Sequence, residues 1–294
     1  MKRIAVIGSG SFLARNFIKH SVDNGLDYQF ELYDYCEQDD CPQFHFNKID
    51  FSDPEDVKRI DFSVDVIMIF IGKTGTAVGF DNFKAFIEVN EIMLLNILTA
   101  YVELKSKARI IYPSSRLVFK SNESKLIDED GERECKSVYA ITKQAAEEYL
   151  TVYADAFGAE IVILRICTPI GTLLHDFGHY GTFEIFKNQA LQNKEITVFG
   201  DGSQRKTFTW MNDICRAFTK IIEKESILFR DYNLGGQALS LLQIAEKIAK
   251  EYHVDIKHVP WPEIYLKVDG GSVVFDSARF DGEFGMTYSD IIRV

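Results

Sequence analysis

The 294-residue sequence predicts an α/β fold, in which helices cover both faces of a doubly wound parallel sheet and a smaller C-terminal lobe follows. Three observations lead to this prediction. Short apolar runs alternate with longer amphipathic segments through the first half of the chain. The run at residues 161–165 is almost wholly aliphatic, as a strand buried on both faces requires. After Arg165 the alternating pattern ends and a glycine-rich stretch follows, which indicates the start of the second lobe.

The same patterns assign each element in order. We expect strands at residues 3–7, 29–33, 44–46, 66–70, 109–112 and 161–165, with helices at 12–24, 54–60, 83–104 and 139–157 between them. Further on we expect a helix at 184–193, a hairpin around 200–203, a helix at 211–225, a strand at 232–234 and a helix at 240–252. Residues 1–166, rejoined by 207–235, should form the sheet domain. Residues 167–206 and 236–294 should form the smaller, substrate-binding lobe.

Composition excludes several classes of protein. The 33 Lys and Arg against 44 Asp and Glu give a net charge of −11, which disfavours nucleic acid and acidic membrane surfaces. The longest apolar run, residues 66–71, is far shorter than the roughly 20 residues of a membrane helix. The N-terminus lacks a signal-peptide cleavage site, and the five cysteines are scattered without a CxxC pair, so we expect a reducing cytoplasm. His175 and His179 stand among glycines, and no metal is expected.

A glycine-rich junction between the first strand and the first helix predicts a phosphate site. It reads IGSGSFLA, and Gly8, Gly10 and Ser11 let the backbone approach a pyrophosphate. The helix that follows begins at Phe12 and Leu13 and presents its unpaired N–H groups there. A loop of this kind also serves ordinary strand–helix packing, so alone it is weak evidence.

Two acidic positions strengthen the dinucleotide interpretation. Asp34 follows the second strand, where its carboxylate can accept two hydrogen bonds from an adenosine ribose. A carboxylate there repels a 2′-phosphate, which favours NAD, although nearby Arg15 keeps NADP as the less favoured alternative. Asp50 and Phe51 follow the third strand and suit the edge and face of an adenine.

A candidate catalytic group combines a phenol, an ammonium and a hydroxyl. Tyr139 and Lys143 are four residues apart and share one face of the predicted helix. The ammonium favours the phenolate and lowers the tyrosine pKa from its usual value of about 10, so the phenol can accept a proton. Ser115 ends the fifth strand at the edge of the sheet where α/β sites are built, and it can hold a substrate oxygen beside Tyr139.

With the glycine loop, Asp34, Ser115 and the Tyr139–Lys143 pair in this order, the chain resembles the extended short-chain dehydrogenase/reductase family over nearly its whole length. The resemblance is to the NAD-dependent nucleotide-sugar epimerase/dehydratase branch. It implies a Rossmann-like fold, with Tyr139 as acid and base, Lys143 orienting the nicotinamide ribose, and Ser115 steadying the reacting oxygen. It also implies a homodimer that pairs the helices at 83–104 and 139–157 in a four-helix bundle.

The resemblance continues into the second lobe through VFGDGSQR at residues 198–205 and FTWMND at 208–213. It implies that Arg205 contacts the diphosphate of a sugar nucleotide, a task that suits a planar guanidinium. It adds cofactor contacts at Ile71, Gly72 and Asn90. The substrate contacts that it implies are Lys73, Ser115, Arg116, Thr168 and Arg205.

Departures from the family pattern reduce the number of reactions that the chain is expected to catalyse. Arg116 and Leu117 stand where sugar-nucleotide dehydratases carry acidic residues, so loss of water from the sugar is disfavoured. Ser11, the bulky wall at 70–75, Thr168 and Lys206 also differ from the family, so the identity of the sugar cannot be transferred. The leading hypothesis is an epimerase that oxidises C4 transiently. The alternatives are an NAD(P)H-dependent 4-keto-6-deoxysugar reductase and, less favoured, a non-catalytic dinucleotide-sensing regulator.

Overall fold

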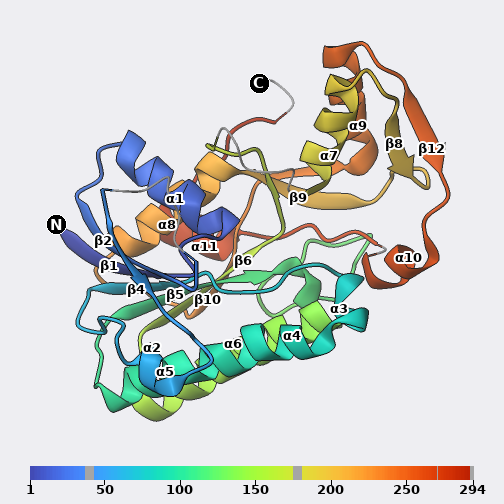
Figure 1. Ribbon diagram of the computed structural model, residues 1–294. Coiled ribbons are helices and arrows are strands. Elements are labelled where there is room, and N and C mark those ends of the chain that lie inside the picture. Colours follow the sequence, from blue (N-terminus) through green and yellow to red (C-terminus); the bar gives the residue numbers. More distant parts are fainter. Residues whose placement is uncertain (37–42, 175–180, 270, 292–294) are drawn as a thin grey trace.

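A seven-stranded parallel sheet forms the centre of the molecule (Figure 1). The computed structural model describes residues 1–36, 43–174, 181–269 and 271–291. The strand order is β10-β6-β5-β4-β1-β2-β3, and every pairing in it is parallel. The strands are β1 (Lys2–Ile7), β2 (Tyr28–Asp34), β3 (His45–Lys48), β4 (Val66–Ile69), β5 (Arg109–Ser115), β6 (Ile161–Ile166) and β10 (Asp231–Asn233). The predicted doubly wound sheet is therefore confirmed.

Helices cover both faces of this sheet because each central strand is apolar on both sides. In β1, Ile4 and Val6 point into one core, and Ala5 and Ile7 point into the other. The first core is covered by α1 (Phe12–Asp23), α8 (Met211–Glu223) and α11 (Ala278–Phe284), which Figure 1 shows above the sheet. The second is covered by α2 (Pro54–Val57), α5 (Met93–Glu103) and α6 (Val138–Phe157), which lie below it.

The expected helix over residues 83–104 has an irregular centre. It consists of α4 (Phe83–Ile87), a π-helical segment η1 (Glu88–Ile92) and α5, and short α3 (Val78–Asp81) precedes it. Among the described residues, Phe83–Glu103 is the one helix with the length and composition to cross a membrane. Its α5 part carries Leu94 and Ile97 into the core below the sheet. A core helix can therefore account for this composition.

The smaller lobe is built on two sheets of its own. β11 (Gln237–Ser240), β9 (Arg205–Trp210) and β7 (Thr168–Ile170) form one sheet, and β12 (Ile256–Val259) and β8 (Ile196–Phe199) form the other. The helices of this part are α7 (Gly181–Leu191), α9 (Leu241–Tyr252) and α10 (Glu263–Asp269). Phe186, Phe208 and Ile244 contribute to a separate apolar core here.

The predicted hairpin around residues 200–203 is wrong. Gly200 and Gly202 do adopt positive φ and turn the chain, but the strands on either side of them do not pair. β8 pairs in parallel with β12, and β9 pairs with β11 and β7. A turn signal is local, whereas the partner of each strand comes from a distant segment.

The junction of the two lobes differs from the sequence-based division at two places. β9, whose residues from 207 onward were expected in the sheet domain, belongs to the small sheet, whereas α8 and β10 return to the large one as expected. α11 was expected in the smaller lobe, but Phe280 and Phe284 pack into the core shared by α1 and α8. The chain therefore passes between the lobes more than once after residue 166.

Candidate active site

A cavity of about 1110 Å³ lies where β1, β2, β3 and β4 end. It is lined by nine of the residues predicted to bind cofactor or substrate: Gly8, Gly10, Ser11, Asp34, Asp50, Phe51, Ile71, Gly72 and Lys73. Residues from four separate strand ends thus meet at one edge of the sheet. This is where a doubly wound fold binds a dinucleotide.

The loop between β1 and α1 is shaped for close approach of a ligand. Gly8 has φ +79°, and a Cβ there would lie 2.5 Å from the backbone nitrogen of Ile71. Ser11 caps α1 by accepting a hydrogen bond from the amide of Ala14 at 3.4 Å. The start of α1 therefore faces the cavity, and its backbone N–H groups suit a pyrophosphate. Phe12 and Leu13 pack their side chains into the core, so only their backbone can take part.

Asp34 is held at the end of β2 by the glycine loop itself. Its carboxylate accepts hydrogen bonds from the amides of Gly10 and Tyr35, both at 2.8 Å. Asp50 and Phe51 follow β3 on the same side of the cavity. The arrangement fits the adenosine half of a dinucleotide, since the carboxylate stands beside the loop that would hold the phosphates.

Lys143 connects α6 to the end of β5. Its ammonium donates hydrogen bonds to the hydroxyl of Tyr112 and to the carbonyl of Pro113, both at 2.9 Å. Burial lowers the pKa of Lys143 to about 7, and the carboxylate of Glu147 partly offsets that effect. A Cβ built on Gly72 would lie 3.9 Å from the lysine nitrogen. Lys143 thus lies next to the wall of the cofactor cavity.

Asn90 holds that wall in place from the π-helical segment. Its side-chain oxygen accepts a hydrogen bond from the amide of Lys73 at 2.7 Å, and its side-chain nitrogen donates to the carbonyl of Lys73 at 3.1 Å. The same nitrogen donates to the hydroxyl of Thr142 at 2.9 Å. Asn90 was predicted as a cofactor contact, and its amide ties the Gly72–Lys73 segment to α6. π-Helical turns are common at functional sites because they redirect single side chains in this way.

Ser115 and Tyr139 flank the same end of β5. The Ser115 hydroxyl caps the short helix η2 (Arg116–Val118) by accepting a hydrogen bond from Leu117 at 3.3 Å. Burial raises the pKa of Tyr112, and the charge that Tyr139 carries when deprotonated adds to that rise. The ring of Tyr139 meets that of Phe86 edge-on, with 6.5 Å between the centroids. The predicted catalytic residues therefore gather around Tyr112 and the end of β5.

Glu147 is a buried carboxylate that the sequence motifs did not indicate. It accepts hydrogen bonds from Ser114 at 2.5 Å and from Arg165 at 2.8 and 2.9 Å, and Arg133 lies 3.2 Å away. Burial alone would raise the pKa of Glu147, but Arg165, Arg133 and Ser114 together hold that pKa below its usual range. Glu147 thereby joins α6 to β5 and β6. Its place four residues after Lys143 was a signal that could have found it.

Lys206, rather than Arg205, points into the protein between the two lobes. Arg205 is exposed, and within the described part of the chain its guanidinium bonds the carbonyl of Ala238 at 3.4 Å. Lys206 is buried, and its ammonium lies 3.2 Å from the Asp269 carboxylate. Neighbouring residues of a strand face opposite sides, so Arg205 and Lys206 point away from each other, and the contact of Arg205 with a diphosphate stays a prediction.

Asp269 also pairs with Arg116, at 2.5 Å. Burial lowers the pKa of Arg116, but the ion pair with Asp269, together with smaller effects of Cys167 and Tyr139, leaves this pKa raised. Burial lowers the pKa of Lys206 to about 8. Predicted Thr168 is half-buried at the start of β7, opposite Phe208 of β9.

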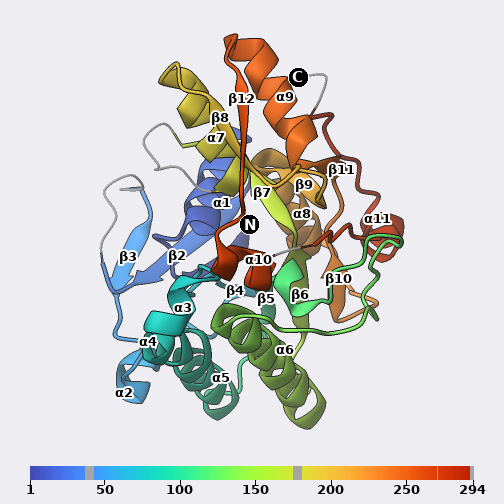
Figure 2. The ribbon, with the colours of Figure 1, turned by 90° about the vertical axis from the view of Figure 1, so that its right-hand side faces the viewer.

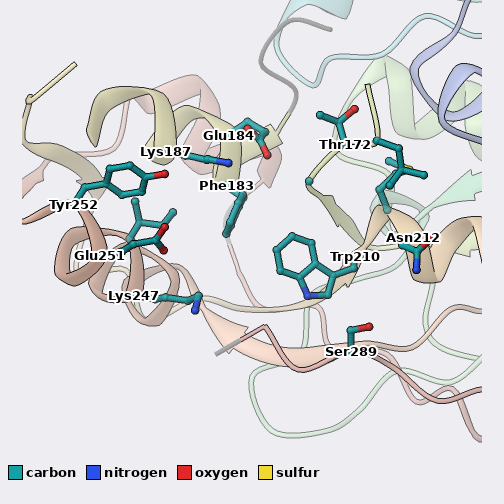
Figure 3. A pocket seen from close by; sticks show the side chains of 14 residues that line it. Thr172, Phe183, Glu184, Lys187, Trp210, Asn212, Lys247, Glu251, Tyr252 and Ser289 are labelled. Carbon is teal, nitrogen blue, oxygen red and sulfur yellow. The ribbon is translucent and has the colours of Figure 1, made fainter. Parts of the chain in front are cut away.

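A second cavity, of about 530 Å³, lies between α7, α9 and the end of β9 (Figure 3). Phe183, Trp210 and Tyr252 give it aromatic walls, and Lys187 and Lys247 border it. It contains none of the predicted site residues. The residues with a predicted role in chemistry therefore lie outside this cavity.

No group of three or more potential metal-ligating side chains occurs among the residues that the structure describes. His175, His179 and Cys41 lie outside those residues. The other four cysteines are free thiols.

Comparison with known proteins identifies the family. The model of the NAD dependent epimerase/dehydratase family matches residues 4–235, and the chain belongs to this family, whose cofactor is NAD. An uncharacterised protein of Methanocaldococcus jannaschii is 27% identical, covering 85% of this chain and 80% of the relative. A putative UDP-glucose 4-epimerase of the same organism is 24% identical, covering 98% and 90%. The UDP-glucose 4-epimerase of Thermus thermophilus, solved with NAD, superposes with a TM-score of 0.82 at 20% identity, covering 98% and 94%.

Proposed function

We propose that this chain is a nucleotide-sugar epimerase that oxidises the sugar transiently at C4 and returns the hydride to the opposite face. The observation that carries the proposal is the position of Lys143. It is buried on α6 four residues after Tyr139, and it is hydrogen-bonded at the end of β5 beside the cofactor cavity. An ammonium in this place favours the phenolate form of Tyr139. Bound NAD supplies the hydride acceptor and donor.

Each residue then has a defined role in the reaction. Tyr139 takes the proton of the sugar C4 hydroxyl as the hydride leaves, and it returns that proton after the sugar has turned over. Ser115 donates a hydrogen bond to the same oxygen and holds it against Tyr139. Lys143 keeps the phenol acidic and orients the ribose of the nicotinamide. Asp34 and the loop from Gly8 hold the adenosine and the phosphates.

The substrate of this proposal is a nucleotide diphosphate sugar. The two relatives named as UDP-glucose 4-epimerases act on such a compound by name. The net charge of −11 disfavours nucleic acid as a partner. We further propose that the protein acts in the cytoplasm as a homodimer.

A 4-keto reductase would use the same three residues but would release oxidised cofactor in each cycle. Asp34 supports NAD held within the protein, as an epimerase requires, over NADPH drawn from solution. Purification without added cofactor separates the two activities. An epimerase should retain NAD and interconvert C4 epimers of a sugar nucleotide without added NADH. Dependence on stoichiometric NADH or NADPH would instead show the reductase.

Tyr139→Phe tests the assigned base. The variant should lose about 10²–10⁴-fold in turnover and keep NAD, because only the proton transfer is removed. Tyr149→Phe is the matched control, since Tyr149 lies on the same helix and its hydroxyl bonds Glu91. Unchanged turnover in Tyr139→Phe would refute the mechanism. Binding of NAD with no turnover of any sugar nucleotide would favour the dinucleotide-sensing regulator.

A further inference from the structure

Two buried cations share one carboxylate where the two lobes meet. Arg116 is 8% exposed and Lys206 is 4% exposed, and both bond the same oxygen of Asp269. Arg116 comes from η2, directly after β5, Lys206 from β9 and Asp269 from α10. Figure 2 shows α10 between the large sheet and the smaller lobe. Three segments far apart in the sequence therefore build this cluster.

The cluster carries one more positive than negative charge. Among the described residues, Asp269 is the one carboxylate within ion-pair distance of Arg116 or Lys206. The nearby thiol of Cys167 stays neutral, because burial raises its pKa. A buried charge without a counterion is unfavourable, so a bound anion would complete the site.

The cluster also borders the reacting groups. Arg116 directly follows Ser115, and the Tyr139 charge contributes to the raised pKa of Arg116 after the larger effects of burial and Asp269. In a sugar nucleotide the diphosphate is attached at C1, across the ring from C4. An anion site beside the residue that holds the C4 oxygen therefore suits a substituent on the C5 side of the ring rather than the diphosphate.

The position of Asp269 on a weakly attached helix allows such an anion to displace its carboxylate from Arg116. α10 has seven residues, and Val268 is its one buried side chain. Residues 263–267 are exposed, so the ion pairs of Asp269 are the main polar attachment of this helix. A carboxylate that enters from the substrate can take the place of Asp269 on Arg116 while Asp269 stays near Lys206.

We propose that Arg116 and Lys206 recognise a carboxylate carried by the sugar of the substrate, and that Asp269 occupies this site until the substrate binds. The proposal rests on the proposed function and specifies its substrate class as nucleotide diphosphate sugars with an acidic sugar. A planar guanidinium can donate two parallel hydrogen bonds to a carboxylate in a bidentate geometry. This geometry favours a sugar with a carboxylate over a sugar with a neutral hydroxymethyl group.

The test compares two ligands that differ only at C6. UDP-glucuronate and UDP-glucose are titrated calorimetrically into the NAD-loaded protein. The carboxylate ligand should bind about 10- to 100-fold more tightly, as expected for a hydrogen bond to a charged group. Arg116→Gln should bring this ratio close to one, and Asp269→Asn should increase it. Arg109→Gln is the matched control, because Arg109 is also a buried arginine, but it bonds Glu160 and the end of α8. It should leave the ratio unchanged.

Each outcome supports or overturns the inference. If both ligands bind equally to the wild-type protein, or if Arg116→Gln keeps the preference, the carboxylate site is refuted while the epimerase proposal stands. Equal weakening of both ligands by Asp269→Asn would show that Asp269 only clamps α10, and it would also refute the inference. Binding of NAD but of neither sugar nucleotide would overturn the proposed function together with the inference. Thermal melting of each variant establishes that it is folded.

Discussion

Gly8 and Gly25 both adopt positive φ, but they differ in their surroundings. A Cβ on Gly8 would lie 2.5 Å from the Ile71 backbone, whereas a Cβ on Gly25 would meet nothing within 4 Å. Gly8→Ala should therefore abolish NAD binding and lower stability by several times as much as Gly25→Ala, which should cost about 1 kcal/mol from backbone strain alone. Urea unfolding and NAD titration measure both effects. Equal losses in the two variants would contradict the close packing of Gly8.

Because of Lys143, the free energy of unfolding should increase with pH above about 7. Its pKa is about 7 in the folded protein against an ordinary value of 10.5, so between these pH values the unfolded chain binds more protons than the folded one. The free energy of unfolding that Lys143 contributes therefore rises with pH from about 7 towards 10.5. We compare the free energies of unfolding of the cofactor-free wild type and of Lys143→Met. The wild-type value minus the variant value should rise by up to about 1.4 kcal/mol per pH unit in this window.

Urea unfolding of both proteins at pH 6, 7.5 and 9 checks this expectation. Using the difference between the two proteins cancels the titration of all other groups. A constant difference across the three pH values would mean that Lys143 is not held in a dry environment.

At the residue scale, sequence reasoning identified the groups that belong to short motifs. Gly8, Asp34 and Lys143 lie in segments where the fold is set by neighbours in the sequence. Asp269 could not be found in this way, because its partner Arg116 is 153 residues away. For Arg205, the motif indicated the strand but not which of its residues faces inward, and that inward residue is Lys206.

α6 owes its position to one buried carboxylate as well as to apolar packing. Glu147 accepts hydrogen bonds from β5 and β6, so Glu147→Gln would remove one of the two carboxylates that pair with Arg165 and leave Asp231 as the other. We expect a loss of about 1–3 kcal/mol in the free energy of unfolding. Glu148→Gln is the matched control, because Glu148 is the next residue on the same helix and is exposed. It should change stability by less than about 0.5 kcal/mol.

Denaturant unfolding of both variants measures the difference. A second readout is the pKa of Lys143, which should fall further in Glu147→Gln because the carboxylate partly supports the ammonium. If both variants unfold like the wild type, Glu147 does not anchor α6.

At the element scale, the sequence was most informative where hydrophobic period and capping agree. α1 and α6 begin after Ser11 and Ser137, which cap them, and end close to the predicted residues. The π-helical segment at Glu88–Ile92 was not predicted, because its apolar spacing resembles that of a regular helix. The pairing of β8 with β12 was also missed, because β9, α8, β10, β11 and α9 lie between these two strands in the chain.

The face below the sheet carries apolar side chains that the monomer leaves exposed. They are Phe83, Ile87 and Ile92 on the helix around η1, and Ile141 and Val152 on α6. Exposed apolar side chains gathered on neighbouring helices are typical of an interface. They support the proposed homodimer through a four-helix bundle.

Ile141→Glu combined with Val152→Glu should convert the proposed dimer to a monomer, because each subunit would bury two charges in the interface. Light scattering coupled to size-exclusion chromatography gives the mass directly. Leu191→Glu is the control, since Leu191 is 57% exposed at the end of α7 in the smaller lobe. A dimer that survives the double substitution would refute this interface.

The position of β10 affects how the protein is made. β10 completes the sheet beside β6, yet 64 residues separate Ile166 from Asp231. Until those residues have left the ribosome, β6 is a bare edge, and the sheet lacks the helix α8 that covers one side. The nascent chain therefore passes through an aggregation-prone intermediate, to which a chaperone can bind. A fragment that stops at residue 166 should aggregate rather than fold.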